Sequence, residues 1–311
     1  MAGERDAAVS TTDAVRLDGR VIVITGAGQG IGRAAALAMA KAGGDVVVND
    51  VDGEAAAKVV AEIEALGGRA APAVAAIGTA EAADLCVATA LEAFGRLDVM
   101  ACNAGILRDK VLWNTTDEDF DAVVATHLRG TFTCARAAAR HFRAAGEGGR
   151  LILVSSMAGQ RGNFGQTSYA AAKAGIAAFA RTWSMELAKS GVTVNAIVPN
   201  AMTAMTATAP ALKPYAEMMG RGESLPDKVR QDFGLGGPDD VAALFVYLAS
   251  ERSASVTGQA IGLGGDRLSL WAHPVEAAHA VMAGGWSAER IAEAVETDLA
   301  GAMQSVGIDF I

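Results

Sequence analysis

The chain has 311 residues, 51% of them hydrophobic, a formal net charge of -9 and a pI near 5.0. This length suits one large α/β domain, and the negative charge argues against general binding to nucleic acid. The longest apolar runs, such as residues 21–24 and 151–154, are far shorter than the roughly 20 residues that cross a bilayer. We therefore expect a soluble globular protein that makes no membrane contact.

Residues 1–16 mix charged residues with Ala, Ser and Thr and contain no apolar segment of a secretion signal. We expect them to form a flexible N-terminal arm on a cytoplasmic protein. Cys86, Cys102 and Cys134 are odd in number and lie in apolar surroundings, which is typical of buried thiols in a reducing compartment. The cysteines and the 4 histidines have no metal-ligand spacing, so we expect no metal site.

Short β-branched runs alternate with alanine-rich stretches along most of the chain. The runs predict strands at residues 21–25, 46–50, 70–75, 97–102, 151–155 and 192–198. The stretches between them predict helices at residues 32–42, 54–66, 80–94, 119–144 and 169–190. This order predicts an α/β, Rossmann-like fold with a doubly wound parallel sheet, which binds ligands at the carboxyl ends of its strands.

The alternation breaks after Pro199. Residues 200–237 are rich in Ala, Met, Thr and Pro, which predicts a mobile substrate lid, and a helix resumes at residues 238–250. Beyond Asp266, the helical stretch 287–303 has no obvious core of its own. We therefore predict a single domain at residues 17–265, followed by a C-terminal extension at residues 266–311.

A glycine-rich turn, Thr-Gly-Ala-Gly-Gln-Gly-Ile-Gly at residues 25–32, directly follows the first strand and opens a helix. A helix N-terminus presents free N–H groups and the positive end of its dipole, and glycine lets the backbone approach a pyrophosphate closely. Such a turn alone can be only a tight turn. Its position after the first strand favours dinucleotide binding.

Asp50 closes the second strand about 20 residues beyond this turn, where a carboxylate accepts hydrogen bonds from the adenosine ribose and repels a 2′-phosphate. The turn contains no Arg or Lys that would pair with a 2′-phosphate. Asp50 can also be a plain turn residue beside Asp52 and Gly53. The pattern favours NAD over NADP as the cofactor.

Tyr169 and Lys173 stand one helical turn apart with three alanines between them, and Ser156 follows an apolar run. A phenol titrates near 10, so proton transfer at neutral pH needs a nearby positive charge, which Lys173 can supply. A lone Tyr-x-x-x-Lys is more often an ordinary exposed pair. In combination with the glycine turn, Asp50 and Ser156, which precede it in the chain, the pair predicts a catalytic site.

The glycine turn, Asn103-Ala104-Gly105, Ser156 and Tyr169-x-x-x-Lys173 occur in the order typical of the short-chain dehydrogenase/reductase family, which the chain resembles over about residues 17–265. The resemblance implies that Tyr169 is the general acid/base. It also implies that Lys173 binds the nicotinamide ribose and lowers the pKa of the tyrosine, and that Ser156 hydrogen-bonds the substrate oxygen. The other positions expected to contact NAD are Gly26, Gln29, Gly30, Ile31, Gly32, Asp50, Asn103, Ala104, Gly105, Pro199 and Thr203.

A narrower likeness comes from residues 47–50, 105–109, 127–130, 163–166 and 199–200. These are similar to the (3R)-hydroxyacyl-CoA dehydrogenases, a group that includes part of peroxisomal multifunctional enzyme type 2 and bacterial stand-alone enzymes. The likeness implies NAD-dependent oxidation of a 3-hydroxyacyl-CoA, with a fatty acyl or steroid side chain, to the 3-oxoacyl-CoA. A hydroxysteroid dehydrogenase, a 3-oxoacyl reductase and a non-catalytic dinucleotide-binding scaffold stay as alternatives.

Asn163, Phe164 and Gln166 lie between Ser156 and Tyr169, so we expect them to border the substrate pocket. A CoA substrate needs cations for its phosphates, and the candidates, which can equally be surface charges, are Arg108, Lys110 and Arg161. The methionines of the predicted lid can form an adaptable apolar cover or ordinary core; these are Met202, Met205, Met218 and Met219.

His127 stands where the family usually has Asn, so it either takes part in a proton relay or simply packs within its helix. The family resemblance also implies a homo-oligomer, a dimer or a tetramer. In such an assembly, the segment after Asp266 can cover a neighbouring subunit's site.

Overall fold

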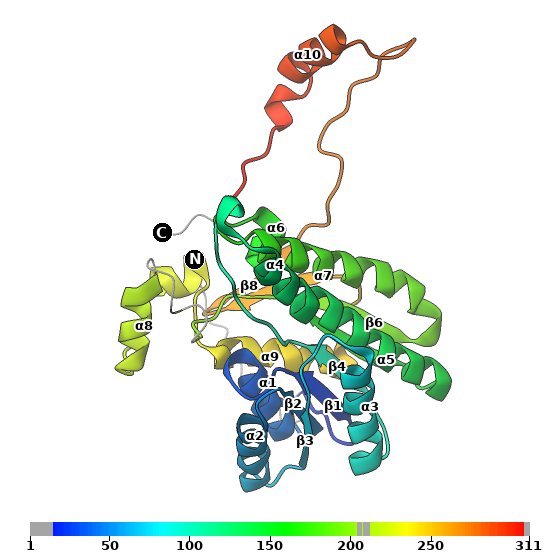
Figure 1. Ribbon diagram of the computed structural model, residues 1–311, viewed down its shortest axis with the longest axis vertical. Helices are drawn as coiled ribbons and strands as arrows, with labels where there is room; N and C mark the ends of the chain where they lie inside the picture. Colours follow the sequence, from blue (N-terminus) through cyan, green and yellow to red (C-terminus); the bar gives the residue numbers. More distant parts are fainter. Residues whose placement is uncertain (1–14, 204–206, 208–211, 308–311) are drawn as a thin grey trace, which may run out of the picture.

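The computed structural model describes residues 15–203, 207 and 212–307 of the chain. Its centre is an eight-stranded sheet in the order β3-β2-β1-β4-β5-β6-β7-β8 (Figure 1). The strands are β1 (Val21–Thr25), β2 (Asp45–Asp50), β3 (Ala70–Val74), β4 (Val99–Cys102), β5 (Gly149–Val154), β6 (Val192–Pro199), β7 (Ala260–Gly264) and β8 (Arg267–Trp271). All neighbouring strands pair in parallel except β7 and β8, which are antiparallel.

Helices cover both faces of this sheet (Figure 1). One face carries α1 (Gly30–Lys41), α2 (Gly53–Ala65) and α9 (Pro238–Ala249), and the other carries α3 (Ala80–Phe94), α5 (Gly130–Ala145) and α7 (Thr167–Glu186). Because both faces are covered, every residue of β1, β4 and β5 is buried. The predicted doubly wound fold is confirmed.

The long helix predicted at residues 119–144 is divided in the structure. It consists of α4 (Asp117–Val124), a π-helical turn η3 (Ala125–Arg129) and α5. The wider π turn holds His127 with its Nε2 atom 3.0 Å from the amide nitrogen of Ile106. Such turns often occur at functional sites, and the apolar spacing of the sequence gives no sign of this one.

The sheet extends further than the sequence predicted. Strands β7 and β8 were not expected, and the predicted domain boundary at residue 265 falls inside the hairpin that joins them. Two of the five residues of β7 are glycines, which weaken the strand pattern. β8 covers the edge of β7, so the sheet continues to Trp271.

Residues of the predicted lid have a small core of their own. Its buried members in the described part of the chain are Met202, Leu212, Leu225, Val229 and Leu235. Met218 and Met219, from α8 (Lys213–Gly220), pack against it half-buried, as ordinary core residues do. Met205 lies outside the described residues, and the lid itself stays a prediction.

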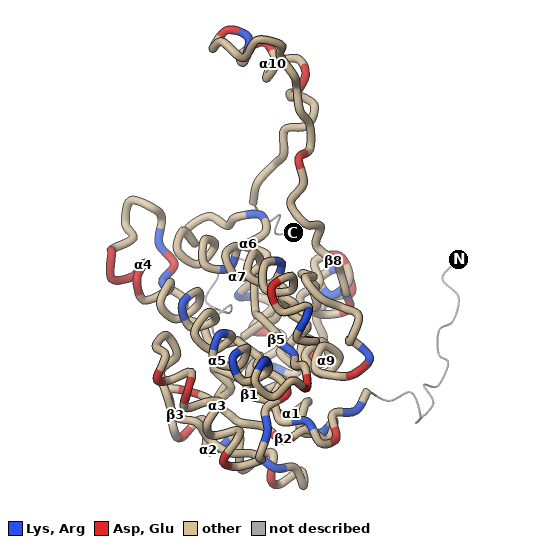
Figure 2. The backbone as a smooth tube through the Cα atoms, turned by 90° about the vertical axis from the view of Figure 1, so that its right-hand side faces the viewer, with Lys and Arg blue, Asp and Glu red and all other residues tan. Residues whose placement is uncertain are grey.

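The C-terminal extension leaves the body after β8. It carries α10 (Ala288–Thr297) and a short helical turn η9 (Ala300–Ala302). In both the ribbon and the tube view it extends far from the sheet before returning beside α6 (Met157–Arg161) (Figures 1 and 2). Residues 1–14 of the predicted N-terminal arm are outside the described part of the chain. None of the described helices is both long enough and apolar enough to cross a membrane.

Candidate active site

The glycine turn lies at the carboxyl end of β1, directly against the segment that follows β4. Gly26 has a φ of +62°, and a Cβ atom there would stand 2.7 Å from the Cα atom of Ala104. A Cβ atom at Gly32 would stand 2.2 Å from the carbonyl oxygen of Gly26. Only glycine allows this close packing, so the shape of the turn depends on these positions.

A set of hydrogen bonds between β1 and β4 fixes the turn. The Oγ1 atom of Thr25 accepts from the backbone amides of Asn103 at 2.9 Å and Ala104 at 3.1 Å. The side-chain amide of Asn103 donates to the carbonyls of Thr25 and Gly26, both at 3.0 Å. Asn103 and Ala104 were predicted at this site. Thr25 was not among the predicted site residues, although a hydroxyl at the end of a buried strand indicates a hydrogen bond to a neighbouring segment.

The first turn of α1 has the features of an anion site. The helix begins at Gly30, and the preceding residue, Gln29, makes no side-chain hydrogen bond to its free amides. These N–H groups and the helix dipole suit a pyrophosphate. The next residue, Ile31, packs half-buried against the core. The turn therefore fits the phosphates of a nicotinamide dinucleotide.

Asp50 ends β2 beside this turn. Its Oδ2 atom accepts from the amide of Gly28 at 2.8 Å, and its Oδ1 atom accepts from the amide of Asp52 at 3.1 Å. A carboxylate offers about four acceptor positions, so it can still bind a ribose hydroxyl. Thr203, which follows Pro199 at the end of β6, also reaches the turn, since a Cβ atom at Gly30 would stand 3.7 Å from its methyl group.

Ser156, Tyr169 and Lys173 meet at the carboxyl end of β5. Ser156 caps α6 by accepting from the amide of Ala158 at 3.2 Å, and it hydrogen-bonds the phenol of Tyr169. The buried ammonium of Lys173 donates to the carbonyl of Val154 at 2.6 Å and lies 5.6 Å from the centre of the tyrosine ring. The structure thus brings the three predicted catalytic residues together.

Two residues that the sequence analysis missed position Lys173. The hydroxyl of Ser155 donates to the backbone carbonyl of Lys173 at 2.8 Å. A Cβ atom at Gly159 would stand 2.5 Å from the carbonyl carbon of Lys173. α6 therefore contacts α7 closely at Lys173.

Burial dominates the electrostatics of this group. It raises the pKa of Tyr169, while the hydrogen bond from Ser156 acts in the opposite direction and the charge of Asp109 raises the pKa further. Burial also lowers the pKa of Lys173 to about 7. Both shifts have the same main cause, because removal from water penalises the charged forms of both groups. The lowering of the tyrosine pKa by Lys173 that the resemblance implies stays a prediction.

His127 lies beside the tyrosine and is only 2% exposed. The two rings meet edge to face, with their centres 5.2 Å apart. The Nε2 atom lies 3.0 Å from the amide nitrogen and 2.8 Å from the carbonyl oxygen of Ile106, whereas Nδ1 is buried without a hydrogen-bond partner among the described residues. Burial, and then the charge of Lys173, lower its pKa to about 3, so the imidazole is neutral. The ring also packs against Gly105, where a Cβ atom would stand 2.2 Å from Cε1.

The expected substrate contacts lie at the mouth of this site. The side-chain amide of Asn163 donates to Gln166 at 2.9 Å, and Gln166 donates to Asp109 at 2.8 Å. Phe164 points into solvent with 86% of its surface exposed. Which of these three residues touch a substrate stays a prediction.

The cations proposed for a CoA phosphate have partners of their own. Lys110 lies 2.6 Å and Arg108 4.0 Å from carboxylate oxygens of Asp119. The guanidinium of Arg161 donates to the carbonyl of Gly307 at 2.9 Å and to the hydroxyl of Ser305 at 3.0 Å. Arg161 therefore anchors the C-terminal extension.

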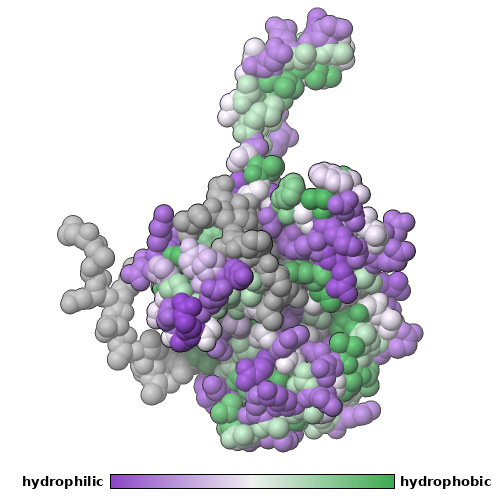
Figure 3. Space-filling view, turned by 60° about the vertical axis from the view of Figure 1, so that its left-hand side comes forward, coloured by the Kyte–Doolittle hydropathy of each residue, from purple (hydrophilic) through white to green (hydrophobic). Residues whose placement is uncertain are grey.

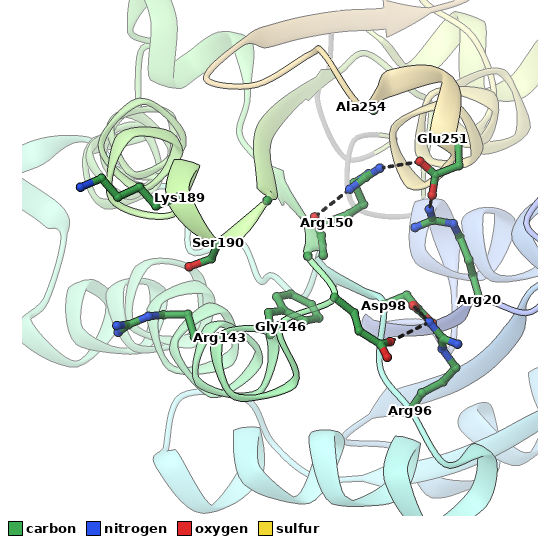
Figure 4. Close-up of a pocket in the computed structure, with 15 residues that line it drawn as sticks. Arg20, Arg96, Asp98, Arg143, Gly146, Arg150, Lys189, Ser190, Glu251 and Ala254 are labelled. Carbon is green, nitrogen blue, oxygen red and sulfur yellow. Dashed lines mark hydrogen bonds and ion pairs between the residues drawn. The ribbon is translucent and has the colours of Figure 1, made fainter.

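A cavity of about 690 Å³ lies far from these residues, at the amino ends of β1, β4, β5 and β6 (Figure 4). Arg20 and Arg150 both pair there with Glu251, while Arg143 and Lys189 extend away from this group. These ion pairs connect the amino ends of β1 and β5 to the short helix η8 (Glu251–Ser253). None of the predicted site residues lines the cavity. A second cavity, of about 420 Å³, adjoins α6 and is lined by Met157, Asn200 and Gly307 among others.

Comparisons with known proteins identify the family. Residues 20–213 match the family model of short chain dehydrogenases. The chain is 46% identical over 203 residues to peroxisomal multifunctional enzyme type 2 of Mus musculus, covering 62% of this chain but only 27% of that protein. It is 41% identical over 276 residues to hydroxyacyl-CoA dehydrogenase ChsB1 of Mycobacterium tuberculosis, covering 85% of this chain and 83% of that protein.

A solved structure shows the same fold. The crystal structure of a short chain dehydrogenase from Mycobacterium avium superposes with a TM-score of 0.82 and 36% identity, covering 96% of this chain and 100% of that one. The protein is thus an oxidoreductase that uses a nicotinamide dinucleotide and acts on a secondary alcohol. By its sequence match, its fold and its Ser-Tyr-Lys site, the chain belongs to the short-chain dehydrogenase family.

Proposed function

We propose that this protein oxidises a 3-hydroxyacyl-CoA, with a fatty acyl or steroid side chain, to the 3-oxoacyl-CoA with NAD. The observation that carries the proposal is the meeting of Ser156, Tyr169 and Lys173 beside a glycine turn that Asp50 flanks. A relative that is named a hydroxyacyl-CoA dehydrogenase and spans most of the chain supports the substrate class.

In this proposal, Tyr169 is the general base that accepts the hydroxyl proton of the substrate. Ser156 donates a hydrogen bond to the same oxygen, and so stabilises negative charge that develops there. Bound NAD supplies the acceptor for the hydride that leaves the carbinol carbon. Because burial raises the pKa of the phenol, the ammonium of Lys173 is needed to favour the phenolate, and each pKa unit corresponds to about 1.4 kcal/mol.

Several residues are proposed to hold the cofactor. The amides at the start of α1 would face the pyrophosphate, and Asp50 would face the adenosine ribose. The carboxylate lies so close to the turn that a Cβ atom at Gly28 would stand 2.8 Å from it. A 2′-phosphate would meet this negative charge, which favours NAD. The remaining proposed contacts are Gly26, Gln29, Gly30, Ile31, Gly32, Asn103, Ala104, Gly105, Tyr169, Lys173, Pro199 and Thr203.

For His127, the geometry favours positioning over proton relay. A ring that relays a proton takes it up at one nitrogen and releases it at the other. Here Nε2 faces only the backbone of Ile106, which has no titratable proton to exchange. We propose that the neutral imidazole fixes the segment at Ile106 and the ring of Tyr169, and that Nδ1 is its only atom open to a further polar contact.

Turnover with a panel of thioesters tests the proposal. We expect NADH formation from (3R)-3-hydroxyacyl-CoA, little formation of NADPH, and loss of activity in Tyr169→Phe with NAD binding retained. Oxidation of a free steroid alcohol alone would support a hydroxysteroid dehydrogenase instead. Reduction of 3-oxoacyl thioesters with NADPH in preference to NADH would support a reductase, which the carboxylate of Asp50 disfavours. Binding of NAD without any oxidation would support a scaffold.

A further inference from the structure

We propose that the cavity of about 690 Å³ at the amino ends of β1, β4, β5 and β6, here called the basal cavity, binds a phosphate group, either free or at the end of an organic phosphomonoester. Arg150 lines this cavity at the start of β5, six residues before Ser156. At a strand rise of about 3.3 Å per residue, the two lie roughly 20 Å apart. The basal cavity is therefore a second site, and its ligand depends neither on the alcohol nor on the dinucleotide proposed above.

The lining of the basal cavity is positively charged. It contains five cationic side chains and three carboxylates, an excess of two positive charges, whereas the whole chain has a formal net charge of -9. Over the body, charges of both signs are interspersed (Figure 2), and hydrophobic residues are mixed with hydrophilic ones on the face shown in Figure 3. The excess of cations is thus a local feature. The five cations are Arg20, Arg96, Arg143, Arg150 and Lys189.

Arg150 is a buried cation whose hydrogen bonds are incomplete. Only 8% of its side chain is exposed. One guanidinium nitrogen donates to the carbonyl of Gly149 at 3.1 Å, and another lies 3.4 Å from a carboxylate oxygen of Glu251, which is long for a hydrogen bond. The buried Nε atom has no hydrogen-bond partner among the described residues. Because a buried N–H group without an acceptor is unfavourable, this guanidinium would gain from an anion in the cavity.

Arg20 and Arg150 compete for one carboxylate. Arg20 also pairs with Glu251, and only 15% of the Arg20 side chain is exposed. Glu251 is itself largely exposed, so water weakens its attraction for both cations. Burial, and then the charge of Arg20, lower the pKa of Arg150. The two guanidiniums therefore carry more positive charge than Glu251 neutralises.

The other two carboxylates of the lining are held by a different cation. Arg96 donates two hydrogen bonds to Asp98, at 2.9 and 2.7 Å, and lies 3.4 Å from Glu147. Asp98 also accepts from the backbone amide of Val21 at 2.8 Å, and its charge acts on Arg150 less than that of Glu251 does. The excess of positive charge thus lies on the four other cations.

Arg143 and Lys189 lie across the basal cavity from Glu251 (Figure 4). Both are exposed, and neither has an ion pair or a side-chain hydrogen bond with any residue that the structure describes. Arg143 is in the last turn of α5, and Lys189 is in the helical turn η4 (Ala188–Ser190) after α7. A cation there also offsets the negative end of a helix dipole, so a control cation at another helix end is needed to separate the two roles.

A phosphate group matches this lining in charge, shape and size. A phosphomonoester carries a charge of about -1.5 to -2 at pH 7, which balances the excess of two positive charges. Guanidinium groups bind phosphate oxygens through paired N–H groups, and a lysine adds a mobile point charge. The volume of the basal cavity lies within the range of about 300–1,000 Å³ that is typical of small-molecule sites. The cavity therefore has room for the organic part of a phosphomonoester.

Calorimetric titration of the NAD-saturated protein with inorganic phosphate and with glycerol 3-phosphate tests the proposal. Bound NAD keeps these anions from the glycine turn, and sodium chloride of equal ionic strength corrects for screening. We expect one binding site per chain. Tighter binding of glycerol 3-phosphate would identify an organic phosphomonoester as the ligand, and tighter binding of inorganic phosphate would identify the free ion. No heat of binding and no rise in Tm beyond the effect of chloride would overturn the proposal.

Removal of the two exposed cations should weaken the site. We expect Arg143→Gln/Lys189→Gln to bind the better of the two ligands about tenfold more weakly. The matched control is Arg140→Gln/Lys41→Gln, which also removes one arginine of α5 and one lysine at the carboxyl end of a helix. Neither control residue lines the basal cavity, so its affinity should equal that of the wild type. Equal weakening in the two double variants would indicate a general effect of charge and reject the site.

Two single substitutions separate ligand binding from a structural role of Arg150. Arg150→Met removes an incompletely paired buried charge, so without phosphate it should resist urea at least as well as the wild type. Phosphate should no longer raise its Tm. Glu251→Gln removes the competing carboxylate and should bind phosphate about threefold more tightly. A wild-type rise in Tm with phosphate in Arg150→Met, or weaker binding in Glu251→Gln, would contradict the proposal.

If Arg150→Met does not fold, the exposed pair Arg143 and Lys189 still decides the proposal. Absence of NADH formation, or of NAD binding, would count against the proposed function only. The comparison of Arg143→Gln/Lys189→Gln with its control would still assign phosphate binding to the basal cavity, and equal affinities in the two would still reject it.

Discussion

Gly159 and Lys173 lie in such close contact that a Cβ atom on the glycine would stand 2.5 Å from the carbonyl carbon of the lysine. α6 carries Ser156 at its start, and α7 carries Tyr169 and Lys173. The distance between these two helices therefore sets the distance between the hydroxyl of Ser156 and the side chains of Tyr169 and Lys173.

Gly159→Ala should separate α6 from α7 and lower kcat about 100-fold, while NAD binding changes little. We expect a loss of about 1–3 kcal/mol in the free energy of unfolding. Gly220→Ala is the matched control, because a Cβ atom at Gly220 meets no atom within 4 Å. Steady-state kinetics and urea unfolding measure both effects, and an equal kcat in the two variants would contradict the packing argument.

Thr25→Val should weaken both the fold and cofactor binding. The substitution keeps the size of the side chain but removes the acceptor for the amides of Asn103 and Ala104. A buried unpaired amide costs about 1–3 kcal/mol. Thr25→Ser retains the hydroxyl and should behave like the wild type. Urea denaturation and NAD titration check this, and a Val variant as stable as the Ser variant would show that the two bonds contribute nothing.

Asp50→Asn should reduce the preference for NAD over NADP by about tenfold, which corresponds to about 1.4 kcal/mol in the difference between the two binding free energies. The substitution removes the negative charge that repels a 2′-phosphate but keeps an acceptor oxygen for the ribose. Asp52→Asn is the control. It makes the same change two residues away, where the side chain caps α2 and asparagine caps equally well. The ratio of kcat/KM for the two cofactors is the measurement, and an equal shift in both variants would point to a general charge effect.

His127 should make the protein sensitive to acid. Its pKa is about 3 in the folded state and about 6.5 when unfolded. Between these values the unfolded chain binds more protons, so stability falls as the pH is lowered from about 6.5, by up to about 1.4 kcal/mol per pH unit for this one group. The contribution of His127 to the free energy of unfolding is fully present above pH 6.5.

In His127→Gln this part of the pH dependence should vanish, whereas His279→Gln, at an exposed position, should keep it. Urea unfolding at several pH values between 4 and 7 compares the slopes. If the slope of the His127→Gln variant equalled that of the wild type, the ring would have to titrate normally in the folded state.

Much of the central fold could be predicted because its strands are buried on both faces. The β-branched run that forms β1 has the bounds expected from the sequence. β7 was not predicted because its two glycines weaken the strand pattern. β8 was not predicted because the turn before it was interpreted as the end of the domain. The π turn at His127 is a single turn of five residues, too short for the apolar periodicity of the sequence to reveal it.

In the candidate site, the residues with distinctive chemistry could be found from order and spacing. The residues that hold these side chains in position could not be found in this way. Ser155 and Gly159 act through contacts with α7 that exist only once the chain has folded. The path of the C-terminal extension away from the sheet could not be predicted either, since the sequence shows only a helix without a core.

The pairing of β5 with β6 has one more consequence. Ser155 and Ser156 are adjacent, yet one is fully buried against the backbone of Lys173 and the other faces the phenol. Successive residues at the end of a strand point to opposite sides, so a shift of one residue in register would exchange the two serines. Which serine meets Tyr169 is therefore decided by strand register, set by pairs such as Leu153 with Ala196, and not by the chemistry of the serine itself.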